Sequence, residues 1–469
     1  MYRFVNLFAP NRPSSAAIWF AVVFMAQPVR AEQQSADLLA VYERLSNEFA
    51  AACPGWRPQP PQTGALVFVA SNQYSAADEE GNEYRAARTK YAEELFELAK
   101  KAVRAGQLSL AFQWATEVLR EIPDHAEARR ILGYENRDGQ WLTVYGARMV
   151  DSGKVWHPKF GWIAAADRPR YESGERLVGT RWMSAEDDAA RRRDIKNGWQ
   201  VRTDHFLVTT NHSLEAAAEL AARLERLHQV WRQLFAGFYL SEKEVRGLFA
   251  GDRQPRRQVR PFRVYYHRDR DEYAAALVRR QPRIGETLGI YFDADRQAHF
   301  FAGTDADLGT LYHEAVHQLF QESKPAAKQI GNLANFWIVE GVATYFETLA
   351  EHLDASAGLY YTIGERAAGR LPAARERLVD GFYVPLAELT RLGKNDLQQH
   401  AELPKLYSQS AGLAAFLMDG QQGRYREPLV RYLEAVYTGR DSTQSLADIT
   451  SVGYDELDAQ YHGYMQSLP

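Results

Sequence analysis

The spacing of hydrophobic positions changes along the chain and divides it into regions. In residues 84–133, apolar side chains recur three and four positions apart, which is typical of amphipathic helices. Gly106 ends the first helix of this pattern, and Pro123 precedes the third. We therefore expect a helical region over residues 32–145.

The following stretch is rich in glycine, tryptophan and charged residues, and its hydrophobic positions show little periodicity. Trp141, Trp156 and Trp162 all lie close to glycine or proline, a combination that favours turns and short strands. We interpret residues 146–198 as a connecting segment.

From residue 199 the pattern predicts short strands followed by helices. Strands are expected at residues 206–209, 262–266, 288–292 and 298–302, with a further short strand earlier in the chain at residues 66–69. Ser213 is placed to cap a long helix after the first of the four. Beyond Asp305 the pattern is mostly helical to the end. Strands first and helices after indicate an α+β fold for residues 199–469.

Composition and charge narrow the chemistry. The chain has 469 residues and a formal net charge of −4, which is too close to neutral for a nucleic-acid-binding protein. Cys53 is the single cysteine, so no internal disulfide can form and no cysteine cluster can bind a metal. Any metal site must therefore be built from histidines and carboxylates.

The N-terminus has the pattern of a secretory signal peptide. Arg3 and Arg12 precede an uninterrupted apolar run at residues 16–26, and Val29 and Ala31 are the small residues that precede a cleavage site. We expect residues 1–31 to be removed and the protein to be secreted or periplasmic. The alternative is an uncleaved membrane anchor, for which the apolar run is short.

An HExxH motif at residues 313–317 is the main candidate for chemistry. Residues four apart on a helix lie on the same face, so His313 and His317 can bind one zinc ion. Glu314 lies between them, where it can act as general base. The motif lies in a run with helical spacing, with Thr304 or Asp305 as the expected cap, and both histidines project away from its apolar stripe. A pair of exposed helix histidines is the alternative.

The residues downstream carry a specific resemblance. The segment 337–347 has a bulky aromatic three residues before Glu340 and continues Glu-Gly-x-Ala-x-Tyr-x-Glu. This resembles the second metal helix of the gluzincins, the zinc peptidases that use two histidines and a glutamate. The resemblance implies Glu340 as the third zinc ligand. It leaves Glu347 as a residue that supports the ligands from behind, or as a solvent-exposed glutamate.

Residues 199–466 also resemble an uncharacterised family of secreted bacterial proteins in the peptidase-MA-like group. The matching pieces are residues 204–208, 312–320 and 407–410. The interval between His317 and Glu340 is longer than in the aminopeptidase branch, and the Gly-x-Met-Glu-Asn segment of that branch is missing. The resemblance therefore implies a zinc peptidase, and favours an endopeptidase acting on a peptide or protein.

The resemblance further implies a hydrogen-bond donor for the oxyanion. Tyr407 opens the segment 407–413, which resembles the part of the family that returns to the active site, and its small residues would permit close helix packing. A purely packing role for this tyrosine is the alternative. His352 is expected on the same helix as Glu347 but off the ligand face, and His400 in a loop, as the next donor to test.

Two further expectations concern binding surfaces. In this family type the strand before the metal helix, here residues 297–302, is an edge strand that can pair with an extended peptide. His299 would then approach the cleft, unless it belongs to a plain strand surface. The helix–glycine–helix–proline–helix order of residues 84–133 is similar to a tetratricopeptide unit, with a small helical bundle as the alternative. This region would dock a protein partner or brace the catalytic part.

Two rival functions remain open from the sequence. One is a zinc-binding but catalytically silent scaffold whose helical region recruits partners. The other is a zinc hydrolase that acts on something other than peptides. The glutamate of the HExxH motif is intact, so nothing in the sequence indicates a dead site.

Overall fold

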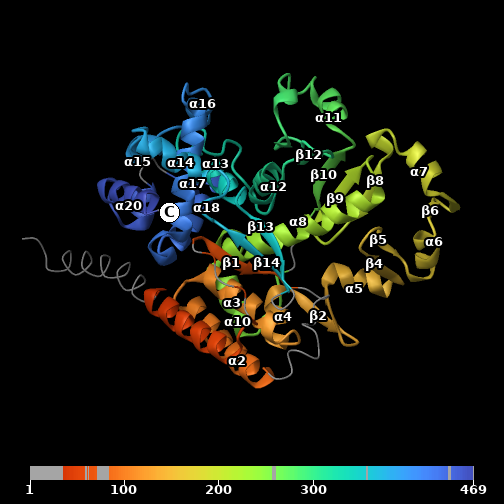
Figure 1. Ribbon diagram of the computed structural model, residues 1–469, viewed down its shortest axis with the longest axis horizontal. Helices are drawn as coiled ribbons and strands as arrows, with labels where there is room; N and C mark the ends of the chain where they lie inside the picture. The colour runs from red at the N-terminus through yellow and green to blue at the C-terminus, as the bar shows by residue number, and fades with distance from the viewer. Residues whose placement is uncertain are drawn as a thin grey trace, which may run out of the picture.

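The computed structural model describes residues 35–56, 58, 61, 63–70, 84–255, 260–354, 358–441 and 445–467. The predicted signal segment, residues 1–31, lies outside this set. Within the described part of the chain, no helix is both long enough and apolar enough to cross a membrane. The structure is a mixed α and β fold with small sheets, consistent with the predicted α+β class (Figure 1).

A five-stranded mixed sheet forms the centre of the site-bearing region. Its spatial order is β11 (Ile290–Phe292), β12 (Gln297–Phe301), β10 (Phe262–His267), β9 (Phe206–Thr210) and β8 (Trp199–Arg202). The three central strands are parallel, and both edge strands are antiparallel to their neighbours. Val208, Val264 and Ala298 lie in register and are fully buried, so one face of the sheet is apolar and must be covered.

Two long helices cover that face. They are α8 (Leu214–Leu234) and α12 (Leu308–Glu322), whose buried residues share one hydrophobic core with the sheet. Ser213 caps α8 as predicted, since its Oγ accepts a hydrogen bond from the Ala216 N–H at 3.1 Å. The cap of α12 is Asp307, so the expected cap at Thr304 or Asp305 is wrong. The Asp307 carboxylate accepts the Thr310 N–H at 2.6 Å and starts the helix later. The shorter α11 (Arg270–Leu277) packs on the opposite face.

The C-terminal half is mainly helical. Its central pair is α13 (Phe336–Phe346) and α17 (Leu403–Asp419), surrounded by α14 (Leu371–Val379), α15 (Leu386–Leu389), α16 (Lys394–Gln398), α18 (Arg426–Thr438), α19 (Ser445–Thr450) and α20 (Tyr454–Gln466). Helices α13 and α17 approach very closely at Gly341. A Cβ there would lie 2.7 Å from the Ser410 carbonyl oxygen, so only glycine permits this contact.

A hairpin interrupts this helical half, which the hydrophobic pattern did not predict. Strands β13 (Ala350–Asp354) and β14 (Gly358–Ile363) pair with each other, and β14 also pairs with β1 (Ala65–Phe68) from near the N-terminus. His352 therefore lies on β13. The helix that was expected to contain it is α13, which ends at Phe346, directly before Glu347. The expected early strand is confirmed, but its partner lies almost 300 residues away, so local patterning could not reveal it.

The predicted N-terminal helices are present. Residues 35–52 are helical, followed by α2 (Arg85–Arg104), α3 (Leu108–Glu121) and α4 (Ala126–Leu132). Their core also contains Val245 and Leu248 from α10 (Glu242–Ala250), which follows α9 (Ala236–Tyr239). The helical region therefore shares its core with residues beyond the boundary predicted at 199.

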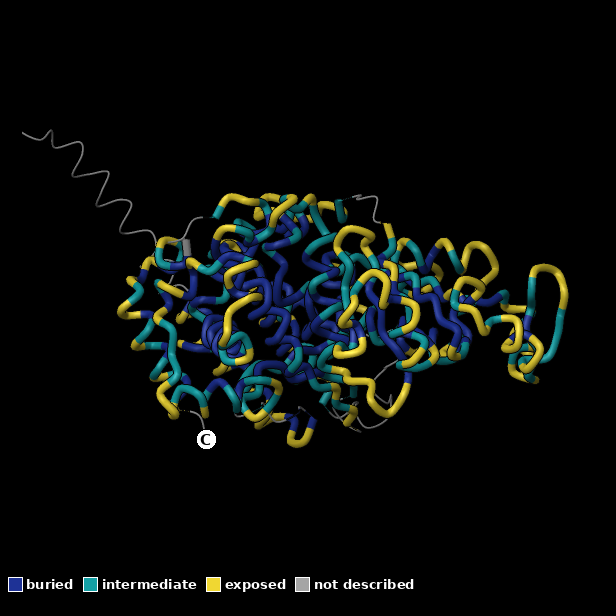
Figure 2. Tube along the Cα trace, turned by 90° about the horizontal axis from the view of Figure 1, so that it is seen from above, coloured by how far each residue is buried: buried dark blue, intermediate teal, exposed yellow. Residues whose placement is uncertain are grey.

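Residues 134–197 form three β-hairpins, each followed by short helices, in an arm that extends from the body of the molecule (Figures 1 and 2). The first hairpin lies within residues 32–145, where a helical region was expected, and the other two lie in the predicted connecting segment, residues 146–198. The elements are β2 (Tyr134–Arg137), β3 (Gln140–Thr143) and α5 (Val144–Asp151); β4 (Lys154–His157), β5 (Gly161–Ala164), η1 (Ala165–Asp167) and α6 (Arg168–Glu172); β6 (Glu175–Val178), β7 (Arg181–Ser184), α7 (Ala185–Arg191) and η2 (Ile195–Asn197). Trp141, Trp162 and Trp182 each take the second position of the returning strand. Short strands were expected here, but their repetition was not recognised.

Candidate metal centre and active-site cleft

Helices α12 and α13 bring the three predicted ligands together. His313 and His317 lie one turn apart on α12, and Glu340 faces them from α13. The two Nε2 atoms are 3.1 Å apart, and the Glu340 Oε2 lies 3.4 Å from His313 Nε2 and 3.5 Å from His317 Nε2. Three donor atoms thus form a nearly equilateral triangle.

This triangle fits a zinc ion. Zinc binds imidazole nitrogen and carboxylate oxygen at roughly 2.0–2.2 Å, so neighbouring donors of a tetrahedral site lie roughly 3.3–3.6 Å apart. The observed separations approach this range without any rearrangement of the helices. Two imidazoles and one carboxylate are also the donor set of several catalytic zinc sites, in which a fourth position stays open.

Glu347 and Arg370 lie behind the ligands. Glu347 follows directly after α13, and its Oε1 is 2.9 Å from His313 Nδ1. Arg370 Nε donates to Glu347 Oε2 at 3.0 Å and holds the carboxylate in place. A proton on Nδ1 that is directed at Glu347 leaves the Nε2 lone pair of His313 facing the other two donor atoms. Glu347 therefore contacts the side of the His313 ring that faces away from Glu340 and His317, and it is not a solvent-exposed glutamate.

The charges of the cluster favour cation binding. Burial alone would lower the pKa of His313, but Glu340 and Glu347 outweigh it and raise that pKa to about 10. Burial would raise the pKa of Glu340, but the two imidazoles hold it well below the ordinary value for a carboxyl. Two carboxylates are therefore ionised beside His313, and a divalent cation can replace its proton.

Glu314 has the surroundings of a general base. Its side chain lines the same cleft, and its Oε2 accepts a hydrogen bond of 2.8 Å from the backbone N–H of Tyr291 on β11. Burial raises the pKa of Glu314, while the neighbouring imidazoles act in the opposite direction. A carboxylate whose pKa is raised toward neutrality is a better proton acceptor than an ordinary glutamate.

Tyr407 reaches the cluster from α17. It lies within that helix rather than at its start, which is at Leu403. Its ring lines the cleft, as does Glu340. Burial first and then the nearby Glu340 carboxylate raise the pKa of Tyr407. The close contact of α17 with α13 at Gly341 brings the two residues together. Tyr407 thus has a protonated hydroxyl beside the three predicted ligands.

The cleft around these residues has a volume of about 820 Å³, within the usual range for a ligand site. His299 and His400 are not among its lining residues. His299 is buried with its Nδ1 3.2 Å from His267 Nε2, on the sheet face that carries α11, and His400 follows α16 at the surface. Of the two interpretations of His299, the approach to the cleft is therefore wrong, and its place on a strand surface away from the cleft is confirmed, although that surface is buried.

The edge strand beside the cleft is β11, not the strand at residues 297–301. That strand, β12, lies between β10 and β11 and has partners on both sides. The family resemblance implied an edge strand at these residues, but β11 pairs with the outer side of β12. Tyr291 of β11 contacts Glu314 and lines the cleft, so β11 is the strand available to an extended peptide.

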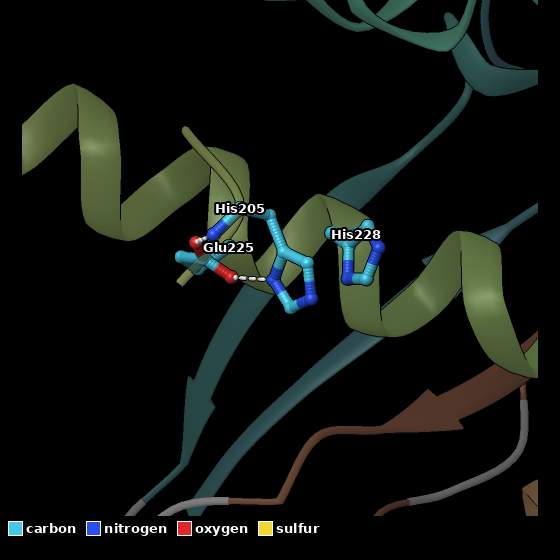
Figure 3. A group of neighbouring side chains, drawn as sticks. All are labelled: His205, Glu225 and His228. Atoms are coloured by element: carbon cyan, nitrogen blue, oxygen red, sulfur yellow. Dashed lines mark hydrogen bonds and ion pairs between the residues drawn. The ribbon is translucent and has the colours of Figure 1, made fainter. Parts of the chain in front are cut away.

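A second group of histidines and a glutamate lies elsewhere and was not recognised from the sequence (Figure 3). His205 lies in the turn between β8 and β9, and Glu225 and His228 lie on α8. One ligand atom from each lies within 4.8 Å of the others. The signal was present as Glu-x-x-His in a predicted helix, a spacing that puts both side chains on one face.

Comparison with known proteins adds no assignment. The chain matches no protein-family model, and no curated protein matches it in sequence. The likeness of residues 313–317 and 337–347 to gluzincins therefore rests on the motifs themselves and on the geometry described above.

Proposed function

We propose that this chain is a zinc-dependent metallopeptidase of the gluzincin type, with His313, His317 and Glu340 as zinc ligands. The observation that carries the proposal is the triangle of donor atoms at 3.1–3.5 Å, with Glu314 lining the same cleft. When bound, zinc would polarise a substrate carbonyl and lower the pKa of a water toward 7.

The protein's own groups supply the remaining chemistry. Glu314 accepts the proton of the attacking water and transfers it to the leaving amine. The Tyr291 N–H holds one oxygen of this carboxylate, so the carboxylate is oriented before substrate binds. Tyr407, whose hydroxyl stays protonated, donates a hydrogen bond to the oxyanion that develops on the carbonyl oxygen.

The surroundings favour internal cleavage of an extended peptide. The outer edge of β11 borders the cleft, and an extended substrate segment can pair with an exposed strand edge. No specific feature of the site favours a silent scaffold, because the proposed base Glu314 and the proposed oxyanion donor Tyr407 both line the cleft beside the ligands. No specific feature favours a hydrolase that acts on other bonds. Secretion after cleavage at Ala31, and docking of a protein partner on residues 84–133, remain part of the same proposal.

The test is digestion of an unfolded, carboxymethylated protein by the purified chain. Internal fragments should form, disappear after chelation, and return when zinc is restored. Glu314→Gln is the matched control, since it keeps the ligands and the side-chain volume but removes the base. Fragments that form in this variant even after chelation would come from a contaminating protease. A peptide-library digest then separates internal cleavage from removal of terminal residues.

A further inference from the structure

His205, Glu225 and His228 form a compact cluster that the proposed peptidase mechanism does not use. Glu225 and His228 are three residues apart on α8, so both project from one helix face, and His205 reaches them from the β8–β9 turn (Figure 3). His228 is buried, whereas the side chains of His205 and Glu225 are 28% and 19% exposed. The cluster therefore has a path to solvent. None of its members lines the active-site cleft.

The hydrogen bonds within the cluster bring the donor atoms close together. Glu225 accepts the backbone N–H of His205 through Oε1 at 2.7 Å, and its Oε2 lies 2.7 Å from His205 Nδ1. The rings of His205 and His228 are stacked, with centroids 3.7 Å apart and planes inclined at 24°. Because imidazole lone pairs lie in the ring plane, an ion can reach both rings only after His205 turns about its side-chain bonds away from this stack.

The charges around the cluster suit a divalent cation. The Asp204 carboxyl lies beside Glu225 and adds a second acidic group to this region. His228 is buried, and one of its ring nitrogens lies within 4.8 Å of the ligand atoms of His205 and Glu225. Arg232 is a nearby cation, but its Nη1 donates to the Leu132 carbonyl oxygen at 3.1 Å.

We propose that His205, Glu225 and His228 form a second metal site for a borderline divalent transition ion such as zinc, nickel or cobalt. Two imidazoles and a carboxylate match the preference of these ions for nitrogen and oxygen donors, and leave further positions for water. Glu-x-x-His on one helix is also a recurring arrangement in metal sites of helical proteins.

The position of the cluster defines what a bound ion does. Tyr134 of β2 and Thr143 of β3 lie close to the carboxylates of Asp204 and Glu225, at the base of the hairpin arm. An ion here fastens the β8–β9 turn to α8 beside the point where the arm joins the body. It is a structural ion, without the general base and cleft that accompany the first cluster.

The test isolates the second site by removing the first. In the untagged His313→Ala/His317→Ala variant, titration with nickel alone in a calorimeter should show one ion bound per chain. Adding His228→Gln removes one of the three proposed ligands and should weaken nickel affinity. Loss of a group that only hydrogen-bonds to a ligand costs roughly 10- to 100-fold in affinity, so loss of the ligand itself should cost at least as much. The matched control is His352→Gln. His352 is half-buried and, like His228, stacked on a ring, here Tyr360, and its replacement should leave nickel binding unchanged.

Two results would overturn the second site. One is the absence of nickel binding in the double variant, and the other is binding that His228→Gln leaves intact. Circular dichroism of each variant checks its fold. If His228→Gln unfolds, Glu225→Gln gives the same comparison, and unchanged affinity in that variant also rejects the site. Because the background lacks the first site, neither outcome depends on whether the chain is a peptidase.

Discussion

Two clusters in this molecule have the same donor types, two histidines and a glutamate, but different surroundings. In the first, the donors come from α12 and α13, and a cleft of about 820 Å³ opens beside them. In the second, the donors come from a turn and from α8, and none of them lines that cleft. The first is ready for an ion as it stands, whereas the second requires rotation of the His205 ring.

In the proposed mechanism, the identity of the donors alone does not make a metal site catalytic. Glu314 and Tyr407 distinguish the first cluster from the second: one is a carboxylate with a raised pKa and the other a tyrosine hydroxyl, and both line the cleft of the proposed active site. Each experiment below removes one of the features that distinguish the first cluster, beginning with the largest effect.

Loss of a ligand should abolish the first site altogether. Glu340→Ala leaves two imidazoles, fewer than the three protein ligands of a catalytic zinc site, so zinc content should fall from about one per chain to near zero and hydrolysis with it. Elemental analysis of protein washed with a weak chelator measures this. Full zinc retention would transfer the ligand role to Glu347, the nearest remaining carboxylate, which lies 2.9 Å from His313.

Removal of the base should separate binding from catalysis. Glu314→Gln is expected to keep zinc and to lower kcat by roughly 10²- to 10⁴-fold, the usual contribution of a general base. The measurement is kcat on a fluorogenic peptide at saturating zinc, together with the zinc content. Activity within tenfold of wild type would mean that another group accepts the proton. Glu314 would then not be the residue that distinguishes the first cluster from the second.

Much of the first cluster could be predicted from the sequence, because its geometry is largely local. Spacing along one helix places His313, Glu314 and His317, and the motif around Glu340 supplies the second helix. The approach of α17 is different. It depends on the missing Cβ of Gly341 against Ser410, a contact between segments about 70 residues apart, so the position of Tyr407 came only from family resemblance.

The features that were missed depend on contacts distant in sequence or on weak repetition. The partner of β1 is β14, in a segment almost 300 residues later. The second cluster needs a turn residue to meet a helix some 20 positions later. The tryptophan spacing of the hairpin arm was visible, but its strands are only four residues long, too short for periodicity to identify them.

The Tyr407 hydroxyl should matter for the rate more than for binding. Tyr407→Phe keeps the ring against the cleft wall and removes the donor, so kcat should fall on the order of 10²-fold with a smaller change in KM. Zinc content should be unchanged. Steady-state kinetics within about threefold of wild type would assign Tyr407 a packing role and leave zinc as the main stabiliser of the oxyanion.

The Glu347 carboxylate should tune the metal rather than hold it. Glu347→Gln keeps a hydrogen-bond acceptor for His313 Nδ1 but removes the charge that Arg370 also contacts. Zinc affinity, measured by competition with a chromophoric chelator, should weaken by roughly 10- to 100-fold. No change in affinity would mean that the charge of Glu347 is not felt at the ligand, and Arg370→Gln would then also be silent.

The smallest expected effect concerns Asp419, a buried carboxylate outside both clusters. Measuring it tests whether the neighbouring charged group decides the direction in which burial shifts the pKa of a carboxyl. Asp419 is buried on α17, accepts the Tyr345 hydroxyl at 2.9 Å and lies 3.4 Å from the Arg426 guanidinium. Burial outweighs these partners and raises the pKa of Asp419 to about 6, whereas the imidazoles lower the pKa of the equally buried Glu340.

The folded protein therefore binds a proton at Asp419 more tightly than the unfolded chain, whose aspartates titrate near pH 4. Between about pH 4 and pH 6 the folded state carries the extra proton, so the free energy of unfolding must decrease as the pH rises through this window. Relative to Asp419→Asn, which cannot titrate, the wild-type protein should lose on the order of 2 kcal/mol across it. Urea unfolding of both proteins at several pH values measures the difference. A difference that increases with pH would show that Arg426 holds Asp419 ionised, and that an arginine can replace the imidazoles in stabilising a buried carboxylate.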